Sequence, residues 1–356
     1  MISACDDEKK PHETAAASPS EIASTLGIDA STLGAPLVDP QKPAGDLQAD
    51  LNAFTTVEAC MKERTQSLDP LVGDAVDAIG YDTFLRDACR VLEAAKAKDA
   101  KKCDSIDASA LRTRCRTVTA MVAGDADGCP LKAPSKPEIG RDATCVAAAL
   151  RSPAMCAGAP KRDRASCEAL VAHDGKKCDA LALDEDRASC ARDAARFRAA
   201  LVGSAAIATI AAPKGTLTIH GEGKPDPAQT SADLDLDVGS GVVVVLDGKK
   251  TRVAFGRVDA SATPRAAQPL DRTRFALSFA TSADKPMDVL EAGIVIPGAT
   301  QVTCASDCAL TVKIGKLEPK RGGAVELTVD GALGGYRVHA DVATFARDVV
   351  DRAATR

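Results

Sequence analysis

Residues 164–190 read RASCEALVAHDGKKCDALALDEDRASC, and this stretch uses the tetrapeptide RASC at both of its ends. Each RASC carries a cysteine into an apolar run, and Cys178 lies between the two in a polar segment. Apolar residues around these cysteines recur at steps of three and four, which is the periodicity of an amphipathic helix. The stretch therefore predicts helices with a cysteine on the buried side, joined by a connector that has a cysteine of its own.

The same unit recurs toward the N-terminus. Connector cysteines follow one another at intervals of 26, 27 and 22 residues, a period within the range of helical repeats. The connector cysteines are Cys103, Cys129, Cys156 and Cys178, and the helix cysteines are Cys60, Cys89, Cys115, Cys145, Cys167 and Cys190. An arginine usually stands three residues before the helix cysteine, but in RDATC Arg141 stands four before Cys145. We predict a disulfide-linked helical repeat array over residues 49–205.

The order of the ten cysteines favours one pairing scheme. If each connector cysteine joined the preceding helix, Cys60 and Cys190 would remain at opposite ends of the array. If each joins the following helix, no cysteine is left over, because Cys60 then pairs with Cys89. The scheme adds Cys103–Cys115, Cys129–Cys145, Cys156–Cys167 and Cys178–Cys190, although ten cysteines allow other connectivities and sequence alone does not fix one. The spacings lack the paired knuckles of a structural zinc site, so we expect disulfides and no metal here.

After about residue 213 the apolar period changes from 3.6 to 2, as in half-buried strands. In TRFALSFAT, for example, Phe275, Leu277 and Phe279 alternate with small or polar residues, and β-rich runs flank Asp247-Gly248 as in a hairpin. Strands without helical crossovers predict an antiparallel β-sandwich, or another closed antiparallel arrangement, over residues 206–356. Cys304 and Cys308 flank a three-residue turn and are expected to form a small disulfide loop. The predicted fold class is α+β with two domains.

The chain begins MISAC, so Ile2, Ser3 and Ala4 precede Cys5. This tetrapeptide resembles the lipobox of bacterial lipoproteins, in which an aliphatic residue and two small residues precede the lipid-modified cysteine. The resemblance implies lipid attachment at Cys5 and membrane anchoring, with the rest of residues 1–48 as a disordered tether of low hydrophobicity. Only four residues precede Cys5, so we expect upstream codons to supply the basic start and apolar run of the signal. The competing interpretation is a chance cysteine near a flexible end.

Composition narrows the range of roles. Aromatic residues make up 3% of the chain and Trp is absent, so a core rich in Ala buries little apolar area per residue and gains from cross-links. A net charge of −5 with interspersed signs argues against nucleic acid as a partner. The segment DLDLDVGSG, with Asp233, Asp235 and Asp237, lacks the glycine and glutamate of a helix–loop–helix calcium site. We assign no catalytic residue, metal ligand or cofactor.

These observations predict a cell-envelope lipoprotein with a binding or structural role, located outside the cytoplasm and anchored in a membrane. Its further partner would be a protein or a polysaccharide of the envelope. The competing hypothesis is a secreted or periplasmic enzyme whose active site lies in a cleft between the two domains. A third hypothesis, a cytoplasmic thiol or metal protein, would keep its cysteines reduced.

Overall fold

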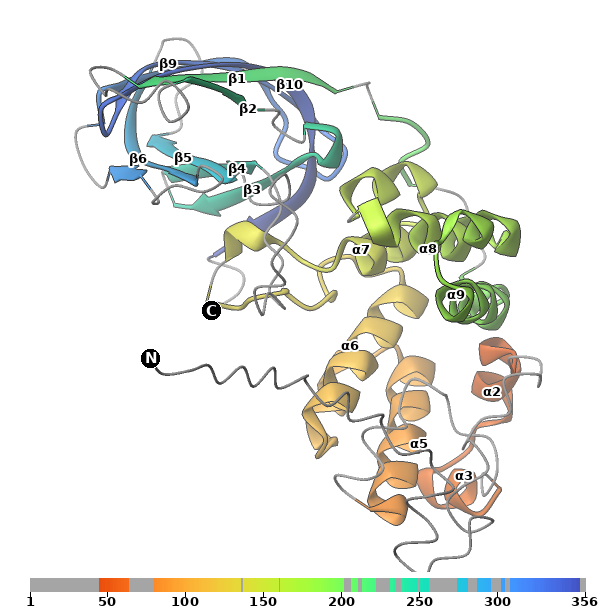
Figure 1. Ribbon diagram of the computed structural model, residues 1–356. Helices are drawn as coiled ribbons and strands as arrows, with labels where there is room; N and C mark the ends of the chain where they lie inside the picture. Colours follow the sequence, from red (N-terminus) through yellow and green to blue (C-terminus); the bar gives the residue numbers. More distant parts are fainter. Residues whose placement is uncertain are drawn as a thin grey trace, which may run out of the picture.

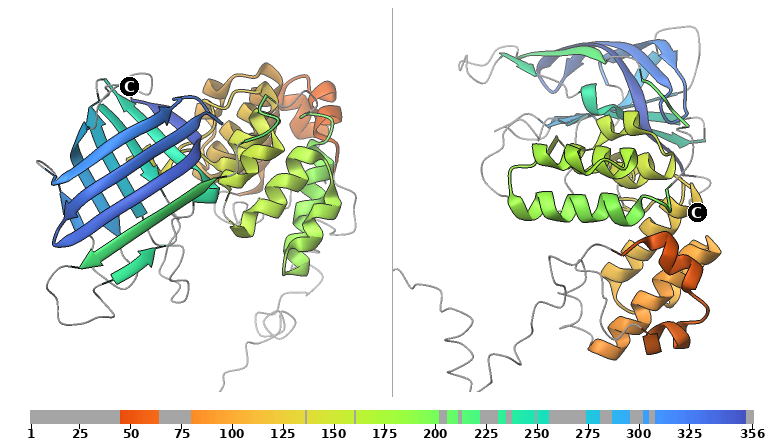
Figure 2. Two further views of the ribbon diagram at one scale, coloured as in Figure 1. Left: turned by 90° about the horizontal axis from the view of Figure 1, so that it is seen from above. Right: turned by 90° about the vertical axis from the view of Figure 1, so that its right-hand side faces the viewer.

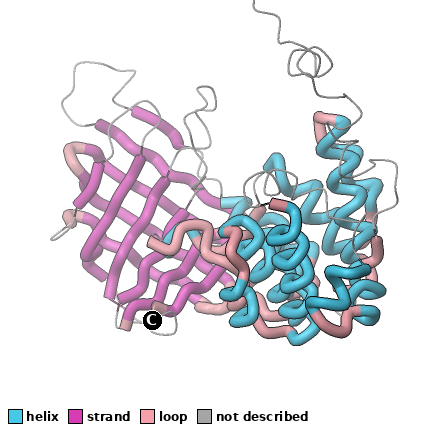
Figure 3. Tube along the Cα trace, turned by 90° about the horizontal axis from the view of Figure 1, so that it is seen from below, coloured by secondary structure: helices cyan, strands magenta, loops and turns pink. Residues whose placement is uncertain are grey.

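The chain folds into a helical part and a sheet part that lie against each other (Figure 3). It is therefore an α+β protein, with the helices first in the sequence and the strands after them (Figure 1). The computed structural model describes residues 45–63, 80–135, 137–159, 161–201, 206–210, 213–221, 231–234, 238–248, 250–255, 274–280, 287–295, 302–304 and 308–352.

Short helices and 3-10 turns alternate in the helical part. They are α2 (Leu47–Ala53), α3 (Val57–Glu63), α5 (Tyr81–Ala97), η2 (Ala100–Ser105), α6 (Ser109–Ala123), η3 (Pro137–Ile139), α7 (Ala143–Ala149), η4 (Pro153–Gly158), α8 (Lys161–Ala172), η5 (Gly175–Ala180) and α9 (Asp184–Phe197). Many buried positions hold Ala or Cys, and in α7 every residue from Cys145 to Ala149 is buried. Such small side chains let the helices approach closely. No helix among the described residues is long and apolar enough to cross a membrane.

Helices α5, α6, α7 and α8 end in the same way. A residue with a left-handed backbone, φ between 52° and 73°, stands directly after α5, α6 and α8 and one residue later, after Leu150, in α7: Lys98, Gly124, His173 and Arg151. The next residue donates its backbone N–H to a carbonyl five positions back, which is the Schellman closure: Asp99, Asp125, Ser152 and Asp174. The connector cysteine stands four residues beyond that Asp or Ser, as in KDAKKC and HDGKKC. The helix end and the connector cysteine are thus parts of one recurring local structure.

The arginine before the helix cysteine holds the connector in place. Arg187 donates to the carbonyl of Leu181 at 2.6 Å, and Arg112 donates to the carbonyl of Ile106 at 2.9 Å. In both cases the acceptor stands three residues after the connector cysteine. Arg164 binds the carbonyl just after its own connector cysteine at 2.9 Å. Each of these arginines therefore ties the connector to the helix that follows it, the same helix that the disulfide reaches.

Six disulfides cross-link the described residues. Those of the helical part are Cys60–Cys89, Cys103–Cys115, Cys129–Cys145, Cys156–Cys167 and Cys178–Cys190, and the sheet part has Cys304–Cys308. These are the partners of the pairing scheme predicted from the sequence. Their Cα atoms lie 5.7–5.9 Å apart, which is the ordinary separation for a disulfide. In the loop-entropy model a cross-link that closes a loop of about 15 residues contributes about 3 kcal/mol to stability.

The strands form one curled mixed sheet. They are β1 (Lys214–Gly221), β2 (Ser231–Leu234), β3 (Val242–Asp247), β4 (Lys250–Phe255), β5 (Arg274–Ala280), β6 (Met287–Val295), β7 (Val302–Cys304), β8 (Leu310–Leu317), β9 (Ala324–Leu333) and β10 (Tyr336–Asp351), with the short turn η6 (Val238–Ser240) before β3. Neighbouring strands run β10–β3–β4–β5–β6–β8–β9 and return to β10, while β1 and β2 extend from β10 and β7 lies beside β6. Two layers result, with β9, β10 and β1 facing β3–β6 (Figure 1), and the strands of one layer cross those of the other (Figure 2).

The pairing of β10 with β3 is parallel, so the prediction of purely antiparallel strands is wrong at this pair. The cause is the length of β10, which spans 16 residues and shifts register between Ala346 and Asp348. Its first part pairs with β9 and β1, and its last part pairs with β3 in the other layer. A single strand thus joins the two layers into one hydrogen-bonded sheet.

Burial along β10 changes where the strand meets the helices. Between Tyr336 and Val342 buried and exposed residues alternate, whereas every residue from Thr344 to Asp348 is buried. Phe345 belongs to the main apolar core of the helical part, so helices cover the outward side of the strand there. The inward side packs in the core between the two layers, where Val338 and Ala340 lie. This strand therefore connects both cores.

Candidate binding site on the outer face of the sheet

A buried ion-pair cluster joins the helical part to β10. The carboxylate of Asp348 accepts hydrogen bonds from the backbone N–H of Arg141 at 2.8 Å and from Nε of Arg321 at 3.0 Å. The guanidinium of Arg141 lies 3.3 Å from the same carboxylate, and both side chains are buried. Arg321 also donates to Asp127 at 2.7 Å, and this hydrogen bond lowers the pKa of the Asp127 carboxyl. Because cationic groups compensate the buried Asp348 carboxylate, removing one partner would leave an uncompensated charge at the contact between the two parts.

Close backbone contacts fill the space around this cluster. A Cβ atom on Gly140, whose φ is +80°, would lie 2.9 Å from the side chain of Val243 on β3. A Cβ atom on Gly158 would lie 3.2 Å from the side chain of Arg347 on β10. The glycines let the helical part approach the sheet closely. The contact at these residues has no room for a substrate, which counts against placing an active site there.

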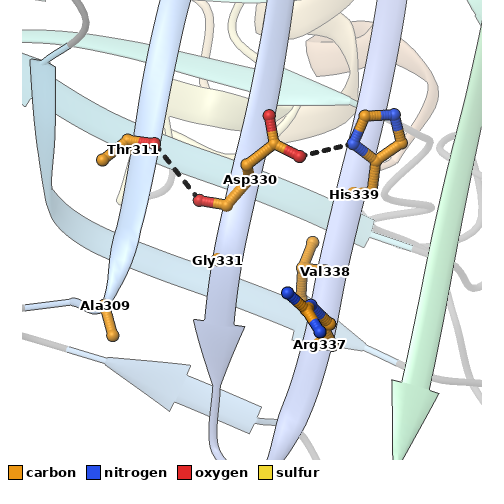
Figure 4. Close-up of a pocket in the computed structure, with 7 residues that line it drawn as sticks. All are labelled: Ala309, Thr311, Asp330, Gly331, Arg337, Val338 and His339. Carbon is orange, nitrogen blue, oxygen red and sulfur yellow. Dashed lines mark hydrogen bonds and ion pairs between the residues drawn. The ribbon is translucent and has the colours of Figure 1, made fainter.

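An open hollow of about 530 Å³ lies on the outer face of the sheet, where β8, β9 and β10 run side by side (Figure 4). The strand register brings its polar residues into one row. Thr311 on β8 is opposite Asp330 on β9, and Asp330 is opposite His339 on β10. Exposed and buried residues alternate along these strands, so the three polar side chains share the solvent face. The full lining is Ala309, Thr311, Asp330, Gly331, Arg337, Val338 and His339.

His339 and Asp330 form a close pair at the centre of this row. Nδ1 of His339 lies 2.5 Å from Oδ1 of Asp330, and the second ring nitrogen points away from the carboxylate (Figure 4). Thr311 donates its hydroxyl hydrogen to the backbone carbonyl of Asp330 at 3.4 Å. Arg337 is exposed and makes no ion pair with another described residue. One ring nitrogen and one guanidinium thus remain available to a ligand.

Small residues open the hollow. Gly331 has φ +142°, and a Cβ atom there would lie 2.0 Å from the backbone oxygen of Ala309. Glycine is therefore required at this close approach of β9 to the start of β8. The disulfide between Cys304 and Cys308 connects β7 to the residue just before Ala309, so it fixes the edge of the hollow. Backbone atoms consequently form part of the floor between the polar side chains.

The chemistry of the hollow suits hydrogen-bonded binding. Asp330 offers a carboxylate and Arg337 offers a guanidinium, so the charges of these two lining residues cancel. A histidine held by a carboxylate can also transfer protons, but acyl or phosphoryl transfer needs a nucleophile and donors for the developing charge as well. Within the described ranges, no three His, Cys, Asp or Glu side chains lie close enough to hold a metal ion.

The residues assigned from sequence lie elsewhere. Cys5 and residues 1–44 of the predicted tether are outside the described residues, as are Asp235 and Asp237 of the calcium-like segment. The last residues of the predicted tether are described, and Leu47 and Gln48 begin helix α2. The disulfide cysteines brace the scaffold, and of these Cys308 comes nearest in sequence to the lining. Sequence reasoning missed the His339–Asp330 pair, although Asp330 stands four residues before Gly334 and His339 stands four residues after Gly335. That hairpin symmetry would have indicated the pair.

Comparisons with known proteins identify no relative of this chain. No protein-family model, curated protein or solved structure matches the chain. A function for this chain is therefore inferred from the arrangement of the described residues. Its main features are the cross-linked helical part, the ion-pair cluster at Asp348 and the open hollow around His339.

Proposed function

We propose that this chain is a lipid-anchored protein of the cell envelope that works by binding, with the hollow at His339 as its binding site. The observation that carries the proposal is the set of disulfides. Six of them occur in the described residues, and cross-links of this kind form and persist in oxidising compartments outside the cytoplasm.

The composition of the helical core supports the same compartment. Buried positions held by Ala contribute little apolar area, so the free energy of folding depends strongly on the cross-links. Removing a native disulfide from a small domain costs about 2–5 kcal/mol. Reduction of five disulfides in the helical part would leave it without a stable fold. A reducing cytoplasm is therefore a poor match for this chain.

The proposed architecture is a rigid repeat array that carries a sandwich-like sheet. The recurring helix end, connector cysteine and arginine support the array, and the two facing layers support the sandwich. The residues ahead of α2, which begins at Leu47, would act as the tether, with the lipid on Cys5, since the MISAC start resembles a lipobox. The tether would place the hollow at a distance from the membrane, where envelope polymers or proteins can reach it.

Lipid labelling and thiol trapping test this proposal in a bacterial host that expresses the chain with its own upstream codons. We expect incorporation of a fatty-acid label, recovery in the membrane fraction, and no alkylation of the disulfide cysteines before reduction. The control is Cys5→Ala, which removes the acceptor thiol and should abolish both the label and the membrane recovery. Unlabelled protein in the cytosol with reactive cysteines would refute the proposal.

An enzyme is the second candidate function, because the 2.5 Å contact between His339 and Asp330 has the geometry of an acid–base pair. In this alternative the active site would be the open hollow instead of a cleft between the two parts. Incubating the purified chain with envelope polymers and analysing the products would test it. Turnover by the wild-type chain that disappears in His339→Gln would support the enzyme, and intact polymer in both samples would exclude it for those substrates.

A further inference from the structure

We propose that the hollow binds a neutral, extended polysaccharide that lies across β8, β9 and β10. The inference rests on the proposed binding role in the envelope and names the chemical class of the partner. It follows from the charges of the outer face, the spacing of its polar side chains and the openness of the site.

Charge balance on this face selects an uncharged ligand. Arg337 and Asp330 have opposite charges and both line the hollow, with Arg337 two residues along β10 from His339, the residue opposite Asp330. An anionic group would meet the Asp330 carboxylate, and a cationic group would meet the Arg337 guanidinium. Sugar hydroxyls both donate and accept hydrogen bonds, so they can bind a carboxylate, a guanidinium and an imidazole in one site.

A second row of polar residues has balanced charges of its own. Lys313 on β8 is opposite Thr328 on β9, and Thr328 is opposite Asp341 on β10. The Thr328 hydroxyl lies 3.4 Å from a carboxylate oxygen of Asp341. This row contains one cation, one anion and one hydroxyl, whereas the cation nearest the first row, Arg337, lies two residues from His339 along β10. It lies two residues along each strand from the first row, which is about 6.7 Å.

The spacing of the rows favours a polymer. Neighbouring strands are about 4.8 Å apart, so Thr311, Asp330 and His339 present a polar group at each such step across the sheet. One pyranose unit of an extended glycan has nearly this length. A glycan that crosses the strands would therefore place one sugar over each strand. One edge of each sugar would face the first row, and the other edge would face the second row.

The shape of the hollow also fits a chain more readily than a small molecule. Small-ligand sites are enclosed and largely apolar, and they bury most of the ligand surface. This hollow is open, its exposed side chains are polar, and the absence of a side chain at Gly331 leaves backbone at its floor. A polymer can lie across such a surface without having an end bound.

Titration calorimetry with the full chain, its disulfides intact, tests the inference. The probes are neutral β-1,4-linked hexasaccharides of glucose and of N-acetylglucosamine, with an oligogalacturonate of equal length as the anionic probe. We expect a neutral probe to bind more tightly than the anionic one. Asp330→Asn and Arg337→Ala should each weaken binding about tenfold, as expected for loss of a hydrogen bond to a charged group.

The matched control is Asp247→Asn, which makes the same chemical change at an exposed aspartate at the end of β3, in the other layer, and should leave affinity unchanged. Circular dichroism would verify that each variant is folded. Preference for the oligogalacturonate, no binding of either neutral probe, or unchanged affinity in Asp330→Asn and Arg337→Ala would each overturn the inference. Envelope location and intact disulfides in the same protein would show that the proposed envelope role survives such a result.

Discussion

Replacing Asp348 with asparagine should loosen the contact between the helical part and the sheet. The substitution keeps the shape of the side chain and removes the negative charge that Arg141 and Arg321 share. The side chains of these arginines are 6% and 13% exposed, so water cannot replace the carboxylate without rearrangement. The amide also has one acceptor oxygen where the carboxylate has two.

The expected cost follows from what each arginine retains. Breaking a buried ion pair by removing one partner costs about 3–5 kcal/mol. Arg321 keeps its 2.7 Å contact with Asp127, and Arg141 keeps hydrogen bonds to the carbonyls of Asp127 and Val349 at 3.1 and 3.3 Å. These remaining partners place the loss at the lower end of the range. We therefore expect Asp348→Asn to reduce the free energy of unfolding by about 3 kcal/mol.

Urea unfolding followed by circular dichroism, with all disulfides intact, measures this loss. The control is Asp247→Asn, because Asp247 pairs with Arg352 at 3.1 Å and both side chains are almost half exposed. A surface pair of this kind contributes less than about 1 kcal/mol. If Asp348→Asn costs no more than Asp247→Asn, the cluster does not stabilise the contact and our reasoning about it is wrong.

Three further predictions concern the cross-links, the helix ends and acid stability. Cys178→Ser should lower the free energy of unfolding by about 2–5 kcal/mol, and peptide mapping of the unreduced wild type should link Cys178 to the following helix and not to the preceding one. Gly124→Ala should destabilise by about 1–2 kcal/mol because its φ is +73°, whereas Lys98→Gly, at φ 53°, should be neutral or stabilising in thermal unfolding. The hydrogen bond from Arg321 lowers the pKa of Asp127, so Asp127 contributes fully to the stability of the fold above the ordinary aspartate pKa. This contribution is lost as the pH falls through the lowered pKa of the folded state. In acid unfolding, Asp127→Asn should remove the loss of stability over this pH range, and a pH profile identical to that of the wild type would contradict the prediction.

The sequence predicted the helices and the strands because these depend on local periodicity, and the order of the cysteines favoured the pairing that the structure has without excluding others. A connector of 11–16 residues reaches the helix that follows it, so nearest-neighbour pairing requires no knowledge of the tertiary fold. The common helix end was harder to find. Sequence signals for a left-handed helix end rely on glycine, and here Lys98, Arg151 and His173 adopt that conformation.

The features missed from sequence depend on contacts between distant segments. A charged residue in a strand pattern is ordinarily placed on the solvent side, so the buried Arg347 and Asp348 gave no sign that β10 continues to residue 351. The parallel pairing with β3 depends on that continuation. The pair of His339 and Asp330, by contrast, is local to one hairpin and was predictable from its turn.

Two irregularities of the sequence have a single physical cause. RDATC places its arginine four residues before the cysteine, where the other units have three, and the strand pattern of β10 is interrupted by Asp348. The neighbouring residues in the sequence explain neither the spacing in RDATC nor the aspartate in the strand. In the structure the Arg141 guanidinium binds the carbonyl of Asp127 in its own connector and also reaches the Asp348 carboxylate, 207 residues away in sequence. A buried charge requires a compensating partner of opposite charge. A charged residue that breaks the sequence pattern of its own segment therefore indicates an oppositely charged residue that breaks the pattern of another segment. Here the two departures are the two sides of the contact that joins the helical part to the sheet.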